Sequence, residues 1–134
     1  MSVSDNKQIA QEIIDAMNKA DWMDHMHKYA GPDLDIAAMK EQQKLFRSAF
    51  PDYHFTVNMM IAEGDTVAIF GTVEATHAQE YPFVELKGVT PSGKKLRWDE
   101  AHCWKFENGK FVAGHFVVDG ANRLRQLGVL AYDD

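Results

Sequence analysis

The chain has 134 residues, of which 46% are hydrophobic and 11% aromatic, and its formal net charge is −6. This size and composition predict one domain over residues 1–134 with a single sizeable core, and they exclude a disordered chain. The negative charge argues against nucleic-acid binding, because phosphates would be repelled. No run of 18 apolar residues occurs in the sequence, so we expect neither a membrane span nor a membrane partner.

Cys103 is the only cysteine, so no disulfide can form within the chain, which is typical of a reducing compartment. The first residues show neither a basic start nor an apolar run, so no secretory signal is expected. We therefore expect a cytoplasmic protein. Because Cys103 falls in an expected strand, we interpret it as a buried, inert thiol.

Three helical segments are expected in the first third of the chain. Apolar residues at helical spacing predict a first helix around residues 9–17, with Ser4 or Asp5 as its N-cap. A short second helix is expected to begin at Asp21. A third is expected from about 36 to 49, and the following proline prevents its simple continuation.

After the helices, the apolar period changes from helical spacing to two, as in strands. Strands are expected over residues 53–61, 66–76, 94–106 and 111–118, with a loop and a short strand within 77–89 and a short helical or irregular cap at 122–127. Helices followed by strands predict an α+β fold, with a curved, mainly antiparallel sheet around the N-terminal helices and an internal pocket. Several strands look apolar on both faces, so we expect the second face to form a homodimer.

The Asn108-Gly109 pair is a strong signal for a two-residue hairpin loop. In a regular hairpin around it, His102 faces His115, and opposed residues share one side of the sheet. The same register pairs Trp104 with Ala113, Glu100 with Val117, and Trp98 with Asp119. That shared side would carry Trp98, Glu100, His102, Trp104, Phe106, Phe111, Ala113, His115, Val117 and Asp119. A β-bulge anywhere in the hairpin would move part of this set to the other side.

This predicted face joins aromatic rings to four ionisable groups, Glu100, His102, His115 and Asp119. Burying such groups costs several kcal/mol unless they are paired or their pKa values move. Shifted pKa values are what acid–base catalysis needs. On a flat sheet the two histidines would have Cβ atoms about 5 Å apart, and Asp119 would lie about 13 Å from His115. The groups would therefore act on opposite ends of one ligand.

Each of these residues also has a structural interpretation. A histidine on an apolar face is often a satisfied core residue. Asp119 precedes Gly120 where a strand ends, so it could serve only as a turn or cap residue. Trp98 and Trp104 would line a core or a pocket wall in either case. No cluster has zinc spacing and no glycine-rich phosphate loop is present in the sequence, so we expect no metal and no cofactor.

Short motifs run in order through nearly the whole chain. They are Phe50-Pro51-Asp52, Ile61-Ala62-Glu63-Gly64-Asp65, Gly71-Thr72-Val73 with Thr76-His77, Thr90-Pro91-Ser92-Gly93-Lys94, Lys105-Phe106-Glu107-Asn108-Gly109-Lys110, and Asp119-Gly120 before Leu124-Arg125-Gln126-Leu127-Gly128. Together they resemble the SnoaL-like polyketide cyclases of the nuclear-transport-factor-like superfamily. The resemblance implies a cone-shaped α+β barrel and an aldol-type ring closure of a hydrophobic carbonyl compound, without metal or cofactor.

The resemblance also implies roles for particular residues. Asp119 matches the acid/base aspartate of the terminal motif, and His102 is the best match to an assisting strand histidine, with His115 as a further catalytic candidate. Substrate contacts are expected from Trp98, Glu100, Trp104, His77 and Val117. The family often has a large aromatic residue where this chain has His115. Asn122 and Arg123 replace a more usual apolar stretch.

Three functions remain open at this point. In the first, Asp119 removes a proton next to a carbonyl group and His102 polarises the oxygen or returns a proton. In the second, the same scaffold performs dehydration or epoxide hydrolysis, the latter through an Asp–Arg–Asp set. Arg97 falls on the opposite face from Asp119 in the predicted register, which disfavours the second function. In the third, the domain binds a hydrophobic ligand without turnover.

Overall fold

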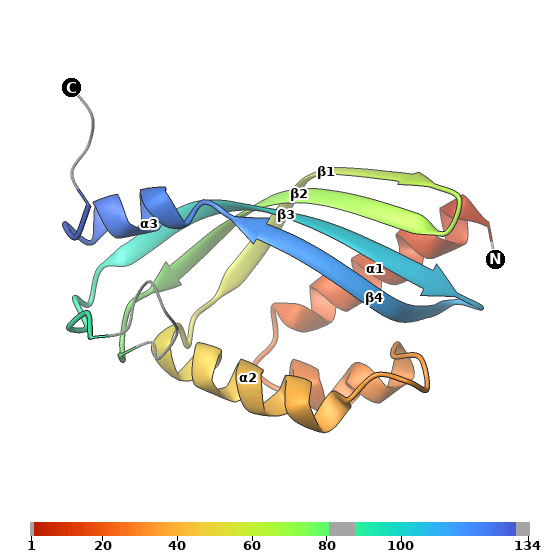
Figure 1. Cartoon of the computed structure of the whole chain (residues 1–134), viewed down its shortest axis with the longest axis horizontal. Coiled ribbons are helices and arrows are strands. Elements are labelled where there is room, and N and C mark those ends of the chain that lie inside the picture. Colours follow the sequence, from red (N-terminus) through yellow and green to blue (C-terminus); the bar gives the residue numbers. More distant parts are fainter. Residues whose placement is uncertain (1, 81–87, 131–134) are drawn as a thin grey trace.

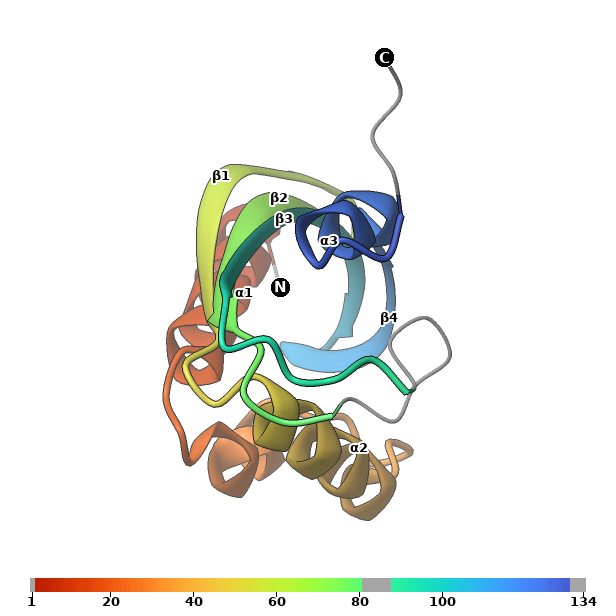
Figure 2. The same cartoon turned by 90° about the vertical axis from the view of Figure 1, so that its left-hand side faces the viewer.

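The computed structural model describes residues 2–80 and 88–130, and its strands form one curved antiparallel sheet in the order β1-β2-β3-β4 (Figure 1). The elements in chain order are α1 (Val3–Met17), the 3-10 helix η1 (Trp22–Lys28), α2 (Ile36–Ala49), β1 (His54–Glu63), β2 (Thr66–Thr76), β3 (Lys95–Glu107), β4 (Lys110–Val118) and α3 (Gly120–Gln126). Helix α1 lies against β1 and β2, and α3 lies against β3. Figure 2 shows the sheet curving over the N-terminal helices. The predicted α+β fold is confirmed.

The helices begin close to where the sequence places them, but one cap differs. Ser2, and neither Ser4 nor Asp5, caps α1: its hydroxyl accepts from the Asp5 amide at 3.1 Å. The Asp5 carboxylate in turn accepts from the Ser2 amide at 3.1 Å, which completes a capping box. Asp21 precedes η1 as predicted but makes no side-chain cap hydrogen bond.

The pairing of β1 with β2 shifts by one residue at Asn58, which has no partner opposite it. Before the shift, Phe55 points inward and is buried. After it, Met60 and Ala62 are the inward residues, and Met59 and Ile61 point outward and are exposed. The alternation expected along residues 53–61 therefore changes face at this bulge.

The pairing of β3 with β4 contains a second shift, between Lys105 and Phe106. The two-residue turn is confirmed, with φ of 49° at Asn108 and 74° at Gly109. Beyond the first two pairs, however, one extra residue in β4 displaces every partner by one position. The predicted His102–His115 pair is therefore wrong.

Along the rest of the hairpin, each residue of β3 pairs with the β4 residue one position further along the chain than the regular register predicts. His102 pairs with Phe116, and His115 pairs with Cys103 on the outer face. Cys103 is exposed, so the interpretation of a buried thiol is also wrong. The predicted pairs of Trp104 with Ala113, Glu100 with Val117 and Trp98 with Asp119 are absent for the same reason.

The core lies between the inner face of the sheet and the helices. Its largest fully buried side chains belong to Trp98, Phe50, Phe55, Phe106, Ile14, Ile69 and Leu96. Gly71 of β2 lies next to the Phe55 ring. A Cβ at this position would be 2.2 Å from the ring, so only glycine lets the ring pack against β2. No helix among the described residues is long and apolar enough to cross a membrane.

Candidate active site

The alternation of β3 sends Glu100 and His102 to the inner face, where both are largely buried. Glu100 is 7% exposed, and the His102 side chain is 11% exposed. The Trp98 indole Nε1 donates to Glu100 Oε1 at 2.9 Å. His102 Nε2 lies 2.8 Å from Glu100 Oε2. We call this buried couple the Glu100–His102 pair.

Tyr53 supports the pair from the segment that leads into β1. Burial raises the pKa of Tyr53 well above its usual value, and the nearby Glu100 carboxylate raises it further. The phenol therefore stays neutral and can donate a hydrogen bond to Glu100. Arg47 of α2 covers the other side of Tyr53, with its guanidinium carbon 4.5 Å from the ring centroid. Burial lowers the pKa of Arg47.

Aromatic rings surround the His102 imidazole. Phe55 and Trp104 meet it edge-on, with centroids 5.5 and 5.7 Å away. Phe116 is stacked on it at 5.6 Å, with 22° between the ring planes. These rings hold the imidazole in one orientation and limit the access of water to it.

The two ring nitrogens of His102 have different surroundings. Nε2 faces the Glu100 carboxylate, which can only accept a hydrogen bond, so in a neutral imidazole the ring proton lies on Nε2. Nδ1 has no hydrogen-bond partner within residues 2–80 and 88–130, and it is not among the fully enclosed polar atoms. In that tautomer Nδ1 carries a lone pair and can accept a proton from a ligand.

The structure brings together part of the predicted site. Trp98, Glu100, His102 and Trp104 lie on the inner face as expected. His115, Val117 and Asp119 lie on the outer side, because the bulge displaces all of β4 beyond it. Their predicted position beside His102 is therefore wrong.

Asp119 follows β4 and begins α3. Its amide donates to the Asp99 carbonyl at 3.0 Å, which continues the pairing of the two strands. Its carboxylate accepts from the Asn122 amide at 3.0 Å and so caps the helix. The geometry agrees with the structural interpretation of Asp119, and no described contact joins its carboxylate to His102.

His77 lies away from the pair, just after β2. It is fully buried, its ring lies 5.7 Å from that of Phe50, and its Nδ1 accepts from the Ser92 amide at 3.4 Å. Burial lowers the pKa of His77. These contacts attach the segment after β2 to the core. Part of the short strand expected within 77–89 lies outside the described residues.

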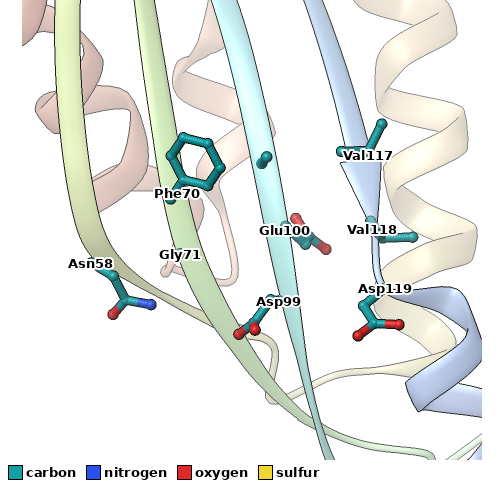
Figure 3. Close-up of a pocket in the computed structure, with 9 residues that line it drawn as sticks. Asn58, Phe70, Gly71, Asp99, Glu100, Val117, Val118 and Asp119 are labelled. Atoms are coloured by element: carbon teal, nitrogen blue, oxygen red, sulfur yellow. The ribbon is translucent and has the colours of Figure 1, made fainter.

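The outer face carries a shallow hollow of about 360 Å³ between β1 and the end of β4 (Figure 3). A polar chain crosses it: the Asn58 amide donates to the Thr72 hydroxyl at 2.8 Å, and that hydroxyl donates to Asp99 at 3.0 Å. Asp119 lies at its rim with the neighbouring Val117. Glu100 of β3 also borders this hollow (Figure 3). Its carboxylate, however, contacts His102 on the inner face. Among the described residues, no group of three or more side chains could hold a metal ion.

Comparison with known proteins identifies the family. The family of SnoaL-like polyketide cyclases matches residues 6–127. This chain belongs to that family. Comparison with curated proteins gives no match.

Two solved structures resemble this SnoaL-like protein over almost its whole length. AclR from Streptomyces galilaeus, a candidate hydroxylase, is 30% identical with a TM-score of 0.84, and the match covers 99% of this chain and 87% of AclR. A candidate polyketide cyclase from Acidithiobacillus ferrooxidans is 25% identical with a TM-score of 0.80, over 98% of this chain and 100% of that one. IdmH from Streptomyces antibioticus, at 22% identity, a TM-score of 0.78 and coverage of 92% and 99%, shows the shared fold.

Sequence reasoning missed two residues of this SnoaL-like site. Tyr53 looks like one more apolar strand residue, and only its burial beside Glu100 reveals its role. The regular hairpin register, in which His102 faces His115, puts Phe116 on the opposite face, and a bulge leaves no clear mark in a pattern of period two. The only signal was the residue Gly114, since glycine within a strand often accompanies a bulge or a close approach.

Proposed function

We propose that this SnoaL-like protein catalyses cofactor-free proton transfer on a hydrophobic carbonyl compound, in a ring closure of the aldol type. The observation that carries the proposal is the buried Glu100–His102 pair with His102 Nδ1 free to accept a proton. Membership of the cyclase family supports a reaction of this class. Burying an ionisable pair among aromatic rings is expensive for a small domain unless it serves a function.

The reaction has two proton transfers, one before and one after a carbon–carbon bond forms. His102 Nδ1 removes a proton from the carbon next to a carbonyl group, and the electron pair delocalises into the oxygen as an enolate. The enolate carbon attacks a second carbonyl carbon of the same molecule, which forms a carbon–carbon bond and leaves an alkoxide. The imidazolium then returns its proton to the alkoxide, so His102 is unchanged at the end.

Glu100 acts through His102. Its carboxylate orients the ring through Nε2 and stabilises the positive charge that the imidazole gains during the reaction. The Trp98 indole, which donates to Oε1, holds the carboxylate in place.

The role of Asp119 stays a separate prediction that rests on the family resemblance. Its cap position on α3 and its place at the outer hollow give that role no geometric support. The substitution Asp119→Asn keeps a side chain that can cap a helix but removes the charge. It therefore separates a catalytic carboxylate from a structural one.

Other functions on the same fold fit the observed contacts less well. The bulge brings Asp119 to the outer side of the sheet, which also carries Arg97, so the predicted placement of these two residues on opposite faces is wrong. Arg97 nevertheless pairs with Glu74 at 3.2 Å, and no described contact places it between two aspartates, as the epoxide-hydrolase set needs. A ligand-binding domain without turnover would not need a proton acceptor such as His102 Nδ1. That alternative predicts binding without any exchange of ligand protons.

Hydrogen–deuterium exchange at a ketone tests the proposal directly. The probe is 2-acetylnaphthalene in D₂O, followed by proton NMR at its acetyl methyl group. The wild-type chain should accelerate exchange, and His102→Asn should lower the rate by about 100-fold or more. Asp119→Asn should keep the wild-type rate. No acceleration by the wild type, or full activity in the His102 variant, would contradict the role of His102. Loss of activity in Asp119→Asn would move the acid/base role to Asp119.

We also propose that the protein forms a homodimer through the outer face of the sheet. Met59, Phe70, Ala101 and Val117 lie in one row, each directly opposite the next across the four strands. The large side chains of this row and the neighbouring Ile61 are between 49% and 68% exposed. A contiguous apolar surface of this kind is typical of a protein interface.

The single, unpaired Cys103 supports a cytoplasmic location.

A further inference from the structure

A second hollow, of about 480 Å³, lies at the end of the sheet where both hairpin turns are found. In Figure 1, the start of α1 reaches this end, beside the turns that join β1 to β2 and β3 to β4. The hollow is lined from these three places by Ser2, Val3, Asn6, Gly64, Asp65, Phe106 and Asn108. It shares no lining residue with the hollow on the outer face or with the Glu100–His102 pair.

Asn6 brings a buried polar group to this hollow. The residue is 3% exposed, and its Oδ1 is fully enclosed without a hydrogen-bond partner among residues 2–80 and 88–130. A helical side chain leans toward the N-terminus of its helix, so the carboxamide lies over the first turn of α1, where it lines the hollow. A buried acceptor without a partner costs free energy. A ligand that donates a hydrogen bond to Oδ1 would remove this cost.

The charges around the hollow favour a neutral ligand. The first amides of α1, at Val3 and Ser4, have no partners within the helix, and the partial positive charge of a helix N-terminus disfavours a cation. The carboxylates of Asp5 and Asp65 disfavour an anion, because like charges repel. Hydrogen bonds from Ser2 lower the pKa of Asp5, so this carboxylate is charged at neutral pH.

We propose that this hollow binds a neutral ligand through an amide group, with Asn6 as the residue that recognises it. The N–H of a lactam would donate to Oδ1, and the lactam carbonyl would accept from Nδ2 of the same carboxamide, which gives two parallel hydrogen bonds. The methylene groups of the lactam would cover Val3, which is 38% exposed, and remove apolar surface from water. The proposal is independent of the proposed catalysis, because the two sites share no residue.

An NMR titration of the full chain with two matched probes tests this site. The probes are 2-piperidone, which is a lactam, and N-methyl-2-piperidone, whose nitrogen has no hydrogen to donate. 2-Piperidone should shift the backbone amide signals of Val3, Asn6 and Gly64, and the signals of Glu100 and His102 should not move. It should bind about tenfold or more tightly than the methylated probe, which leaves Oδ1 without a donor.

A pair of leucine variants separates recognition by Asn6 from a structural role. Asn6→Leu should abolish the shifts caused by 2-piperidone, and it should raise the urea concentration at the midpoint of unfolding, because it removes an unpaired acceptor from the core. The matched control is Gln8→Leu, which removes a carboxamide from an exposed position of the same helix. It should keep the binding of 2-piperidone and leave the midpoint nearly unchanged.

Several results would overturn the role of Asn6. These are equal binding of the two probes, no shift with 2-piperidone, shifts only at Glu100 and His102, or binding that survives in Asn6→Leu. A lower urea midpoint in Asn6→Leu would also contradict the proposal, since it would mean that the carboxamide stabilises the fold. The comparison of the two probes on the wild type decides the question even if Asn6→Leu does not fold.

Discussion

Gly114 lies directly opposite Trp104 in the pairing of β3 with β4. A Cβ at Gly114 would lie 3.1 Å from the indole Cδ1 and 2.8 Å from Cζ of Phe111. The Phe111 ring fills the space that the glycine leaves, and it meets Trp104 edge-on at 5.6 Å. In the regular hairpin register, Ala113 would occupy this position. The bulge instead puts a residue without a side chain opposite Trp104, and the Phe111 ring packs in its place.

Gly114→Ala should therefore destabilise the fold. The added methyl group forces the rings of Phe111 or Trp104 to move, and overpacking of this kind costs about 1–3 kcal/mol. Urea unfolding followed by circular dichroism gives the free energy of unfolding. The matched control is Ala113→Ser, which alters the exposed neighbour of Gly114 and should change stability by no more than about 0.5 kcal/mol. Equal stability of the two variants would show that the register does not depend on this contact.

The sequence predicts the elements well because most of its signals are local. The third helix and the strand over residues 66–76 have the expected bounds, since a proline and a Gly-Asp turn mark their ends. The turn at Asn108-Gly109 also forms as expected. Each of these features depends on residues next to it in the chain.

The site is predictable only where it depends on one strand. Glu100 and His102 share the inner face with Trp98 because all three alternate along β3, whatever β4 does. The faces of His115 and Asp119 depend on the register between two strands. That register contains a bulge beside the contact of Phe111 with Trp104, a three-dimensional feature that a period of two does not reveal.

Glu100→Gln should lower the rate of ketone deuteration by about 10- to 100-fold, with a smaller effect on the Kd of the ketone. The amide can still bond to His102, but it lacks the negative charge that stabilises the imidazolium. NMR exchange rates at several ketone concentrations separate rate from binding. Glu74→Gln removes a carboxylate from the exposed outer face and should leave the rate unchanged. A wild-type rate in Glu100→Gln would show that His102 does not need the carboxylate.

Tyr53 should make the protein less stable at alkaline pH. Its pKa in the folded state is raised above the ordinary value of 10.0 by burial and by Glu100. Above pH 10 the unfolded chain loses the phenol proton while the folded chain keeps it. The unfolded state then binds fewer protons, so the free energy of unfolding falls as pH rises, until the pH passes the pKa of the folded state. The slope approaches about 1.4 kcal/mol per pH unit.

Comparison of the wild type with Tyr53→Phe isolates this contribution, because lysines titrate alike in both chains. Urea unfolding at pH 8, 10 and 11 should show a steeper loss of stability in the wild type above pH 10. The phenylalanine variant lacks the ionisable group and should lose less. Parallel curves above pH 10 would mean that Tyr53 ionises with its ordinary pKa in the folded protein.

Ile61→Asp should convert the proposed homodimer into a monomer. The side chain is 56% exposed at the edge of the apolar row, so the monomer tolerates a charge there. In a dimer the carboxylate would be buried against the apolar residues of a second copy, which costs several kcal/mol. Analytical ultracentrifugation of both chains across a range of concentrations gives the association state.

The matched control for this interface is Leu45→Asp, which puts the same charge on α2. Leu45 is 48% exposed, close to the exposure of Ile61, but it lies on a helix away from the outer face of the sheet. It should leave a dimer intact, so only a charge on the apolar row should separate the subunits. A monomeric wild type, or dissociation caused equally by both variants, would contradict the proposal that the outer face is the dimer interface. The row would then be an exposed apolar surface whose partner is not a second copy of this chain.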